Sequence, residues 1–146
     1  LTGDYTTKEL DIGIGDLPNF CSQLLPLPRG TVIYLVGDLG AGKTTLAREL
    51  IRNVLGSQEL IVASPTFTLL QQYPYSEGVL NHLDLYRLEK LNDVLALGYE
   101  ELIEQGITLV EWPQLLIDAG YKPDLLLELE FVPNNPNHRK IQLFHF

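Results

Sequence analysis

The apolar residues of the chain change spacing several times, and each change marks the border of a predicted element. Residues 32–36 are consecutive apolar residues, mostly β-branched or aromatic, and such a run is typical of a buried strand. Beyond this run, apolar residues recur at the three- and four-residue spacing of an amphipathic helix, at Ala47, Leu50, Ile51 and Val54. Gly56 is placed to end that helix. A strand, a loop and a helix therefore follow one another.

The loop between that strand and that helix carries residues 37–45, Gly-Asp-Leu-Gly-Ala-Gly-Lys-Thr-Thr, which match the phosphate-binding pattern G-x-x-x-x-G-K-S/T. Its glycines allow successive backbone N–H groups to point at phosphate oxygens, beside the positive end of the helix. We expect Lys43 to reach the β- and γ-phosphates of a nucleotide and the Thr44 hydroxyl to bind Mg²⁺. The alternative is a glycine turn that only resembles such a loop. The predicted nucleotide-binding residues are Asp38, Leu39, Gly40, Ala41, Gly42, Lys43, Thr44 and Thr45.

The rest of the chain predicts further strands and helices. Strands are expected at residues 10–14, 60–63, 69–73, 79–86, 107–110, 125–131 and 139–146, and helices at 16–25, 92–97, 99–105 and 113–120. In the strand at 125–131, Leu125, Leu127, Leu129 and Phe131 share one face, opposite Glu128 and Glu130. The fold class predicted is α/β, a P-loop NTPase-like arrangement of three layers, α/β/α, with a mixed sheet of a parallel core and antiparallel hairpins. A length of 146 residues suits one domain, 1–146.

Two carboxylates end strands that could lie beside the strand before the phosphate-binding loop. One is Asp84, and the other is Glu111, which directly follows the apolar residues 107–110. A short Asp suits the coordination shell of Mg²⁺, whereas a longer Glu can reach a water molecule beyond the γ-phosphate. Hydrophobicity favours Glu111 as the acid that ends the strand next to the loop. The alternative is that either residue is only a strand-end carboxylate.

Charge and cysteine content narrow the choice of partners and compartment. The formal net charge is −9 and the ten basic residues are scattered, so the chain is poorly suited to grip a nucleic-acid backbone unaided. The single cysteine, Cys21, lies in an apolar helical stretch and is expected to be a packed thiol in a reducing cytosol. No run of 18 apolar residues indicates a membrane span, and the first residues lack the regions of a signal peptide. These features predict a cytoplasmic protein with no membrane association.

Five sequence blocks in series carry a resemblance to a known family. They are residues 37–45, Ser-Pro-Thr-Phe at 64–67, His-Leu-Asp-Leu-Tyr-Arg at 82–87, Leu-Gly-Tyr-Glu-Glu at 97–101 and Val-Glu-Trp-Pro at 110–113. Together they resemble the bacterial TsaE (YjeE) family. That family is the small ATPase of threonylcarbamoyladenosine (t6A) synthesis at position 37 of tRNAs. The resemblance implies ATP and Mg²⁺ as cofactors, and the TsaB and TsaD proteins as partners that hold most of the tRNA.

The same resemblance implies roles for individual residues. Thr66 would lie in a switch-like loop near the γ-phosphate and the metal ion, and Asp84 would serve Mg²⁺. Glu111 would be the catalytic or water-positioning carboxylate, and Lys43 is the other residue predicted to be catalytic. Trp112 would lie near the nucleotide or in the core. Arg87 would neutralise phosphate or pair with an acid, and His82 is expected to be structural. Residues 15–18 stand where the family carries a threonine, so no base contact is assigned.

Three other functions fit a phosphate-binding loop. A small-molecule kinase needs an arginine-rich lid, which the scattered arginines do not suggest. A GTPase needs an Asn/Thr-Lys-x-Asp base reader, and the nearest match, residues 121–124, begins with Tyr. A nucleotide-binding module without hydrolysis would act by association alone. Because the sequence offers no evident arginine finger, we expect weak ATPase activity in isolation.

Overall fold

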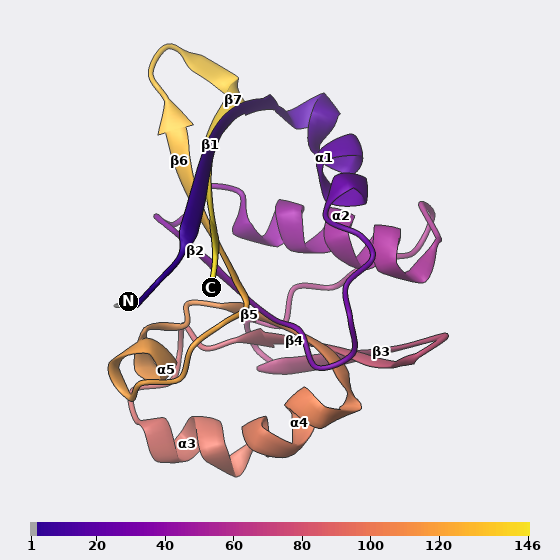
Figure 1. Cartoon of the computed structure of the whole chain (residues 1–146), viewed down its shortest axis with the longest axis vertical. Helices are drawn as coiled ribbons and strands as arrows, with labels where there is room; N and C mark the ends of the chain where they lie inside the picture. The colour runs from indigo at the N-terminus through magenta and orange to yellow at the C-terminus, as the bar shows by residue number, and fades with distance from the viewer. Residues whose placement is uncertain (1–2) are drawn as a thin grey trace.

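The computed structural model describes residues 3–146 and places its strands in a single sheet (Figure 1). Positions 1 and 2 of the domain predicted over 1–146 lie outside the described residues. The strands are β1 (Thr6–Gly13), β2 (Val32–Gly37), β3 (Leu70–Tyr75), β4 (Gly78–Asp84), β5 (Gly106–Glu111), β6 (Leu125–Val132) and β7 (Asn135–His145). The helices are η1 (Ile14–Asp16), α1 (Leu17–Gln23), α2 (Lys43–Leu55), α3 (Leu91–Ala96), α4 (Tyr99–Gln105) and α5 (Gln114–Asp118).

The sheet is mixed, as predicted. Its strand order is β1-β7-β6-β2-β5-β4-β3. Strand β2 pairs in parallel with β5 on one side and β6 on the other, and β5 pairs in parallel with β4. The hairpins β3–β4 and β6–β7 are antiparallel, and β1 adds an antiparallel edge on β7. The parallel strands therefore form the core of the sheet, and antiparallel strands complete both edges.

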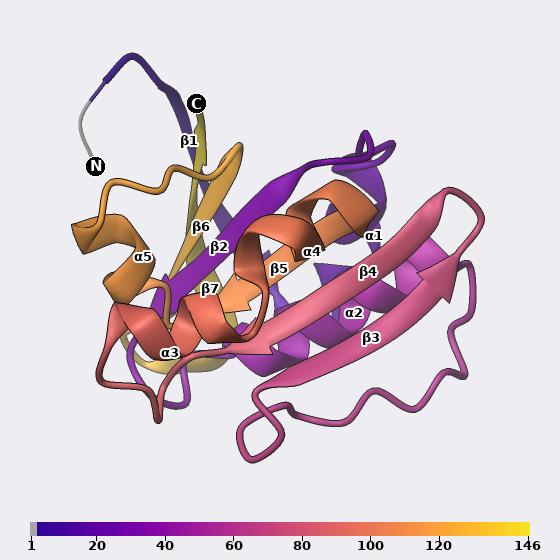
Figure 2. The same cartoon turned by 90° about the horizontal axis from the view of Figure 1, so that it is seen from below.

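Helices cover both faces of the sheet, which confirms the three-layer α/β/α arrangement (Figures 1 and 2). Helices α1 and α2 pack on one face, where Phe20, Leu46 and Leu50 are buried with Leu35 and Leu109 of the sheet. Helices α3, α4 and α5 lie on the other face, where Val94, Leu102 and Leu116 pack with Tyr34 and Leu83. Burial of such apolar side chains is the main favourable term in folding. No helix within residues 3–146 is long and apolar enough to cross a membrane.

The parallel core brings the predicted site residues to one edge of the sheet. Glu111, the last residue of β5, pairs in register with Leu35 of β2 on one side and with Asp84 of β4 on the other. The loop after β2 leads directly into α2 at the same edge. Ligands of parallel α/β sheets bind at the carboxyl ends of the strands, because the loops that reach them converge there.

The prediction of a strand at residues 60–63 is wrong. This segment has no regular secondary structure, although Val62 is buried and Ile61 is 88% exposed. The alternation of inward and outward side chains is present, but β3 ends the sheet, and no strand within residues 3–146 pairs with the segment. A strand needs a hydrogen-bonded neighbour, and the local pattern of side chains does not supply one.

The face predicted for β6 is correct except at its end. Leu125, Leu127 and Leu129 are buried, whereas Phe131 is 51% exposed. The pairing of β6 with β7 shifts between Phe131 and Val132, where the hairpin extends beyond the helical layers (Figure 1). Cys21 is fully buried in the core, as expected, and burial raises the pKa of its thiol to about 12.

Candidate nucleotide-binding site

The loop between β2 and α2 has the backbone form that its glycines allow. Gly40 and Gly42 have φ values of 79° and 104°, which side chains with a Cβ rarely adopt. A Cβ on Gly37 would lie 2.6 Å from the carbonyl oxygen of Leu129 on β6, so glycine is also required there for close packing. The loop borders a cavity of about 310 Å³ at the edge of the sheet. This cavity is the candidate site.

Lys43 lies across the floor of the cavity and is buried. Its Nζ donates hydrogen bonds to the carbonyl oxygens of Gly37 (2.6 Å) and Asp38 (2.9 Å). Burial lowers the pKa of Lys43 from its ordinary value, and the nearby carboxylates of Glu111 and Asp84 oppose that shift. The ammonium group is therefore held by backbone carbonyls and acidic neighbours where a phosphate would enter.

The indole of Trp112 covers Lys43, with Nζ 4.0 Å from the ring centroid. A cation over an indole face is stabilised by about 0.5–2 kcal/mol, depending on desolvation. Trp112 has a φ of 56°, an uncommon conformation for a bulky residue that costs on the order of 1–3 kcal/mol. Tyr86 packs against the indole, with 4.8 Å between ring centroids. A strained turn directly after Glu111 thus places an aromatic wall on the cavity.

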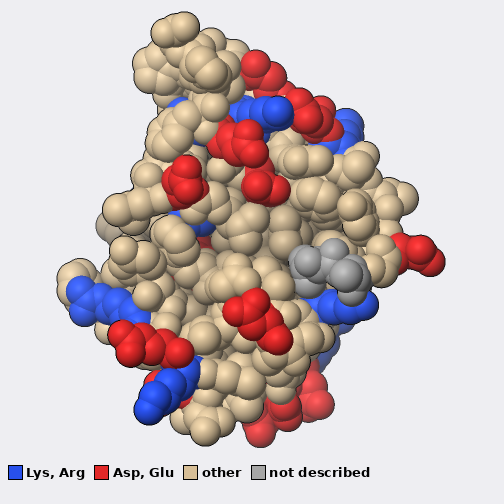
Figure 3. All heavy atoms as spheres, turned by 90° about the vertical axis from the view of Figure 1, so that its left-hand side faces the viewer, with Lys and Arg blue, Asp and Glu red and all other residues tan. Residues whose placement is uncertain are grey.

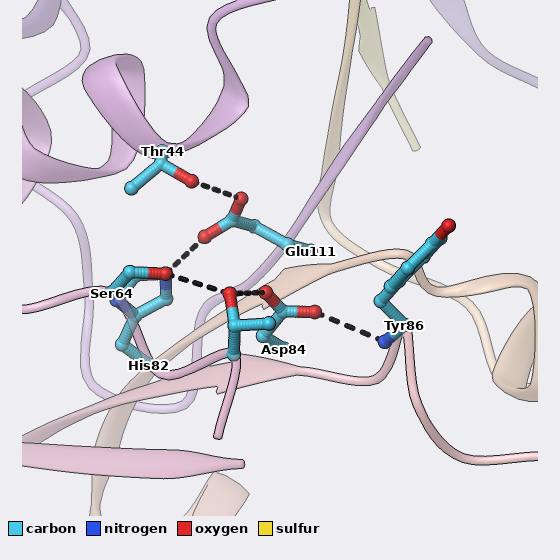
Figure 4. Close-up of polar contacts among 7 residues, drawn as sticks. Thr44, Ser64, His82, Asp84, Tyr86 and Glu111 are labelled. Atoms are coloured by element: carbon cyan, nitrogen blue, oxygen red, sulfur yellow. Dashed lines mark hydrogen bonds and ion pairs between the residues drawn. The ribbon is translucent and has the colours of Figure 1, made fainter. Parts of the chain in front are cut away.

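Glu111 joins the loop to the sheet through both of its carboxylate oxygens (Figure 4). Thr44 Oγ1 donates to Glu111 Oε1 at 2.9 Å, and His82 Nε2 lies 2.7 Å from Glu111 Oε2. Glu111 and His82 are almost fully buried. The hydroxyl predicted to bind Mg²⁺ therefore contacts Glu111 rather than Asp84.

Asp84 is tied to the segment that was predicted to act as a switch. Thr66 Oγ1 donates to Asp84 Oδ2 at 3.0 Å, and the backbone N–H of Tyr86 donates to Asp84 Oδ1 at 3.0 Å. Ser64 and Thr66 also share a hydrogen bond between their hydroxyls (Figure 4). Thr66 and Asp84 thus form a second threonine–carboxylate pair beside the pair of Thr44 and Glu111.

Most of the residues predicted from sequence line this cavity. They are Leu39, Gly40, Gly42, Lys43, Thr44, Thr45, Thr66, Asp84, Glu111 and Trp112. Ala41 and Asp38 do not line it, although the carbonyl of Asp38 holds Lys43. Arg87, for which phosphate neutralisation and an ion pair with an acid were both open, stacks on the exposed ring of Phe67, with its Cζ 4.1 Å from the ring centroid.

Three further residues contact the site or line its cavity, and sequence reasoning assigned none of them to it. His82, which was expected to be structural, contacts Glu111 directly. Tyr86 lines the cavity next to Trp112. Arg139 of β7 donates from Nε to the carbonyl of Ala41 at 2.9 Å, and its guanidinium lies 4.7 Å from the ring centroid of Phe131. His82 stands two residues before Asp84, a spacing that places both on one face of a strand and was a usable signal.

The side chains around the cavity fit a hard divalent cation shared with phosphate. Thr44, Thr66, Asp84 and Glu111 offer oxygen donors, the ligand type that Mg²⁺ prefers. Within residues 3–146, no group of three or more His, Cys, Asp or Glu side chains could hold a metal ion by itself. Magnesium bound through one or two side chains and the phosphates of a nucleotide needs no such group.

Comparison with known proteins gives consistent matches. Residues 15–141 match the family described as threonylcarbamoyl adenosine biosynthesis protein TsaE. Proteins named tRNA threonylcarbamoyladenosine biosynthesis protein TsaE are similar to the chain. The one from Rickettsia prowazekii is 34% identical, with 87% of this chain and 88% of the relative covered. The one from Aquifex aeolicus is 36% identical, with 88% and 89% covered. The protein of that name from Rickettsia conorii is 39% identical, but the match covers only 59% of its length.

A solved structure shares the fold. The crystal structure of Bacillus subtilis YdiB matches 99% of this chain and 88% of its own, with a TM-score of 0.74 and 23% sequence identity. The agreement extends over the whole sheet and both helical layers, since nearly all of the chain is covered. The likeness confirms the α/β architecture.

Proposed function

Because the chain belongs to the TsaE family, we propose that it binds and hydrolyses ATP with Mg²⁺ in support of t6A formation at position 37 of tRNA. One observation carries this proposal. Thr44 of the phosphate-binding loop donates to Glu111 at the end of β5, the strand next to β2. In P-loop NTPases, a hydroxyl on that loop and an acid on a neighbouring strand together serve the metal ion and the attacking water.

In the proposed site, each side chain has a separate task. The loop N–H groups and Lys43 would hold the β- and γ-phosphates, and Thr44, Thr66 and Asp84, which line the cavity, would hold Mg²⁺. When bound, Mg²⁺ neutralises charge on the β- and γ-phosphate oxygens. Glu111 accepts a hydrogen bond from Thr44 and orients the attacking water with its carboxylate. Trp112 keeps Lys43 in place and shields the cavity.

We assign the partners and the compartment from family membership and from the surface. TsaB and TsaD are the proposed partners, and nucleotide-dependent association with them is the proposed mode of action. Leu39 and Phe67 are strongly exposed beside the cavity, which suits a protein that docks over it. The proposal places the protein in the cytoplasm, where tRNA modification would occur, with tRNA held mainly by the partners.

Reconstitution tests the proposed function. Purified chain, TsaB, TsaD, tRNA, ATP, Mg²⁺ and the threonylcarbamoyl donor are combined, and t6A on tRNA is measured with and without the chain. We expect t6A formation to depend on the chain and ATP hydrolysis to rise when TsaB and TsaD are added. Absence of both effects would overturn the proposal. ATP consumption that instead required a small phosphate acceptor would establish a kinase.

A further inference from the structure

His82 occupies an unusual place for a histidine. It is fully buried on β4, on the same face of the strand as Asp84, and Leu109 is its neighbour in register on β5. Its Nε2 lies 2.7 Å from Glu111 Oε2. A fully buried imidazole is costly unless its polar atoms are hydrogen-bonded, and the contact with Glu111 meets that need at Nε2.

The other ring nitrogen fixes which atom carries the proton. Nδ1 of His82 is buried without a hydrogen-bond partner within the described residues. A proton on Nδ1 alone would leave a buried N–H unpaired and turn the Nε2 lone pair toward a carboxylate oxygen. With the proton on Nε2, His82 donates to Glu111 and leaves only a weak acceptor unused. The geometry therefore favours the Nε2–H tautomer.

The two hydrogen bonds on Glu111 act on different oxygens. Thr44 holds Oε1 at the phosphate-binding loop, and His82 holds Oε2 from the sheet. A second hydrogen bond, on the other oxygen, restricts the rotation of the carboxylate more tightly than one hydrogen bond does. We propose that His82 is a positioning residue that fixes the carboxylate plane of Glu111 toward the γ-phosphate end of the cavity.

This inference rests on the proposed ATPase function and predicts a specific kinetic signature. His82 does not line the cavity, so its loss leaves nucleotide affinity within about threefold. Turnover falls, because misplacement of a reacting group by a fraction of an ångström to an ångström costs about 10- to 100-fold. A purely structural role would change stability and affinity together.

Two substitutions at His82 separate positioning from packing. In His82→Gln, the side-chain amide can place an N–H near the position of Nε2, whereas His82→Leu fills the space without a donor. We expect kcat for partner-stimulated ATP hydrolysis to fall about 10- to 100-fold in the Leu variant and to recover at least partly in the Gln variant. Nucleotide affinity, measured with a fluorescent ATP analogue, should stay near the wild-type value in both.

A matched control comes from the same strand. Asn81 is equally buried but faces α4, where its Nδ2 donates to the carbonyl of Leu102. Asn81→Leu therefore removes a buried polar contact from β4 without touching Glu111, and it should lower the melting temperature with little loss of kcat. If His82→Leu hydrolyses ATP at the wild-type rate, or if His82→Gln is no better than His82→Leu, the positioning role is wrong.

A spectroscopic measurement judges the contact without activity. The chain has three histidines, so imidazole ¹⁵N resonances can be assigned by single substitution. We expect His82 to show the Nε2–H tautomer with a strongly downfield proton that moves upfield in Glu111→Ala. A proton on Nδ1, or no change in Glu111→Ala, would overturn the inference even if His82→Leu fails to fold. If the wild-type chain shows no ATPase activity, the proposed function is refuted. The contact between His82 and Glu111 would then be tested by the imidazole resonance alone.

Discussion

At the scale of residues, two carboxylates lie at the ends of neighbouring strands beside the phosphate-binding loop. Each accepts a hydrogen bond from a different threonine. Glu111 accepts from Thr44, and Asp84 accepts from Thr66. The pairing gives the two acids different surroundings although they lie side by side in register on β4 and β5. Their separate roles in our proposal are therefore open to a direct comparison.

Conservative amide substitutions make that comparison. Glu111→Gln should keep nucleotide binding within about threefold and lower turnover by ~100-fold or more, because general-base groups contribute about 10²–10⁴-fold. Asp84→Asn should raise the Mg²⁺ concentration required for half-maximal hydrolysis. Both are measured by ATP hydrolysis across a Mg²⁺ titration, with Glu101→Gln on the exposed surface of α4 as the control. A raised Mg²⁺ requirement in Glu111→Gln and slow turnover in Asp84→Asn would mean that the two roles are reversed.

Single residues were also where sequence reasoning was most and least informative. Lys43, Thr44 and Glu111 could be predicted because loop spacing and strand ends are local properties of the chain. The contact of His82 with Glu111 could not, because it depends on which strand pairs with β4 and on the directions of two buried side chains. The position of each residue in the loop or at a strand end could be predicted from sequence, but its hydrogen-bond partner could not.

At the scale of elements, the β6–β7 hairpin supports the phosphate-binding loop. Arg139 on β7 donates to the carbonyl of Ala41, a residue 98 positions earlier in the chain. The sequence predicted this hairpin as a strand pair but gave no sign of that contact, since long-range contacts depend on the register of the sheet. Likewise, residues 60–63 have the composition of a strand without a neighbour to pair with. The pattern of side chains predicts which face of an element is buried. The order of strands in the sheet decides which residues that face contacts.

Substitution of Arg139 tests this support. Arg139→Met keeps the aliphatic stem but removes the donor to Ala41 and the guanidinium over Phe131. We expect stability to fall by about 1 kcal/mol and nucleotide affinity to fall about threefold to tenfold, because the loop is less firmly held. Thermal unfolding and nucleotide titration measure the two effects.

The neighbouring Lys140 supplies the matched control. Adjacent residues of a strand point to opposite faces, and Lys140 pairs with Glu9 of β1 at 3.2 Å on a partly exposed surface. Lys140→Met should change nucleotide affinity little. Equal losses in Lys140→Met and Arg139→Met would show that the hairpin affects the loop only through general stability.

At the scale of the whole molecule, the main feature is the net negative charge of the surface. Figure 3 shows Asp and Glu side chains interspersed with Lys and Arg over one face, without a large patch of either sign. With a net charge of −9, the surface offers little attraction for a nucleic-acid backbone. This charge agrees with our proposal that tRNA contact belongs mainly to the partners.

The central claim is that the cavity formed by the loop, β4 and β5 hydrolyses ATP, and Lys43→Ala tests it most directly. Steady-state ATP hydrolysis is measured with Mg²⁺ in the presence of TsaB and TsaD, for the wild type, Lys43→Ala and the exposed control Lys90→Ala. We predict activity in the wild type and in Lys90→Ala, and its loss in Lys43→Ala, because this substitution removes the ammonium group that we propose to hold the β- and γ-phosphates. Hydrolysis by Lys43→Ala at the wild-type rate would contradict the assignment of this site.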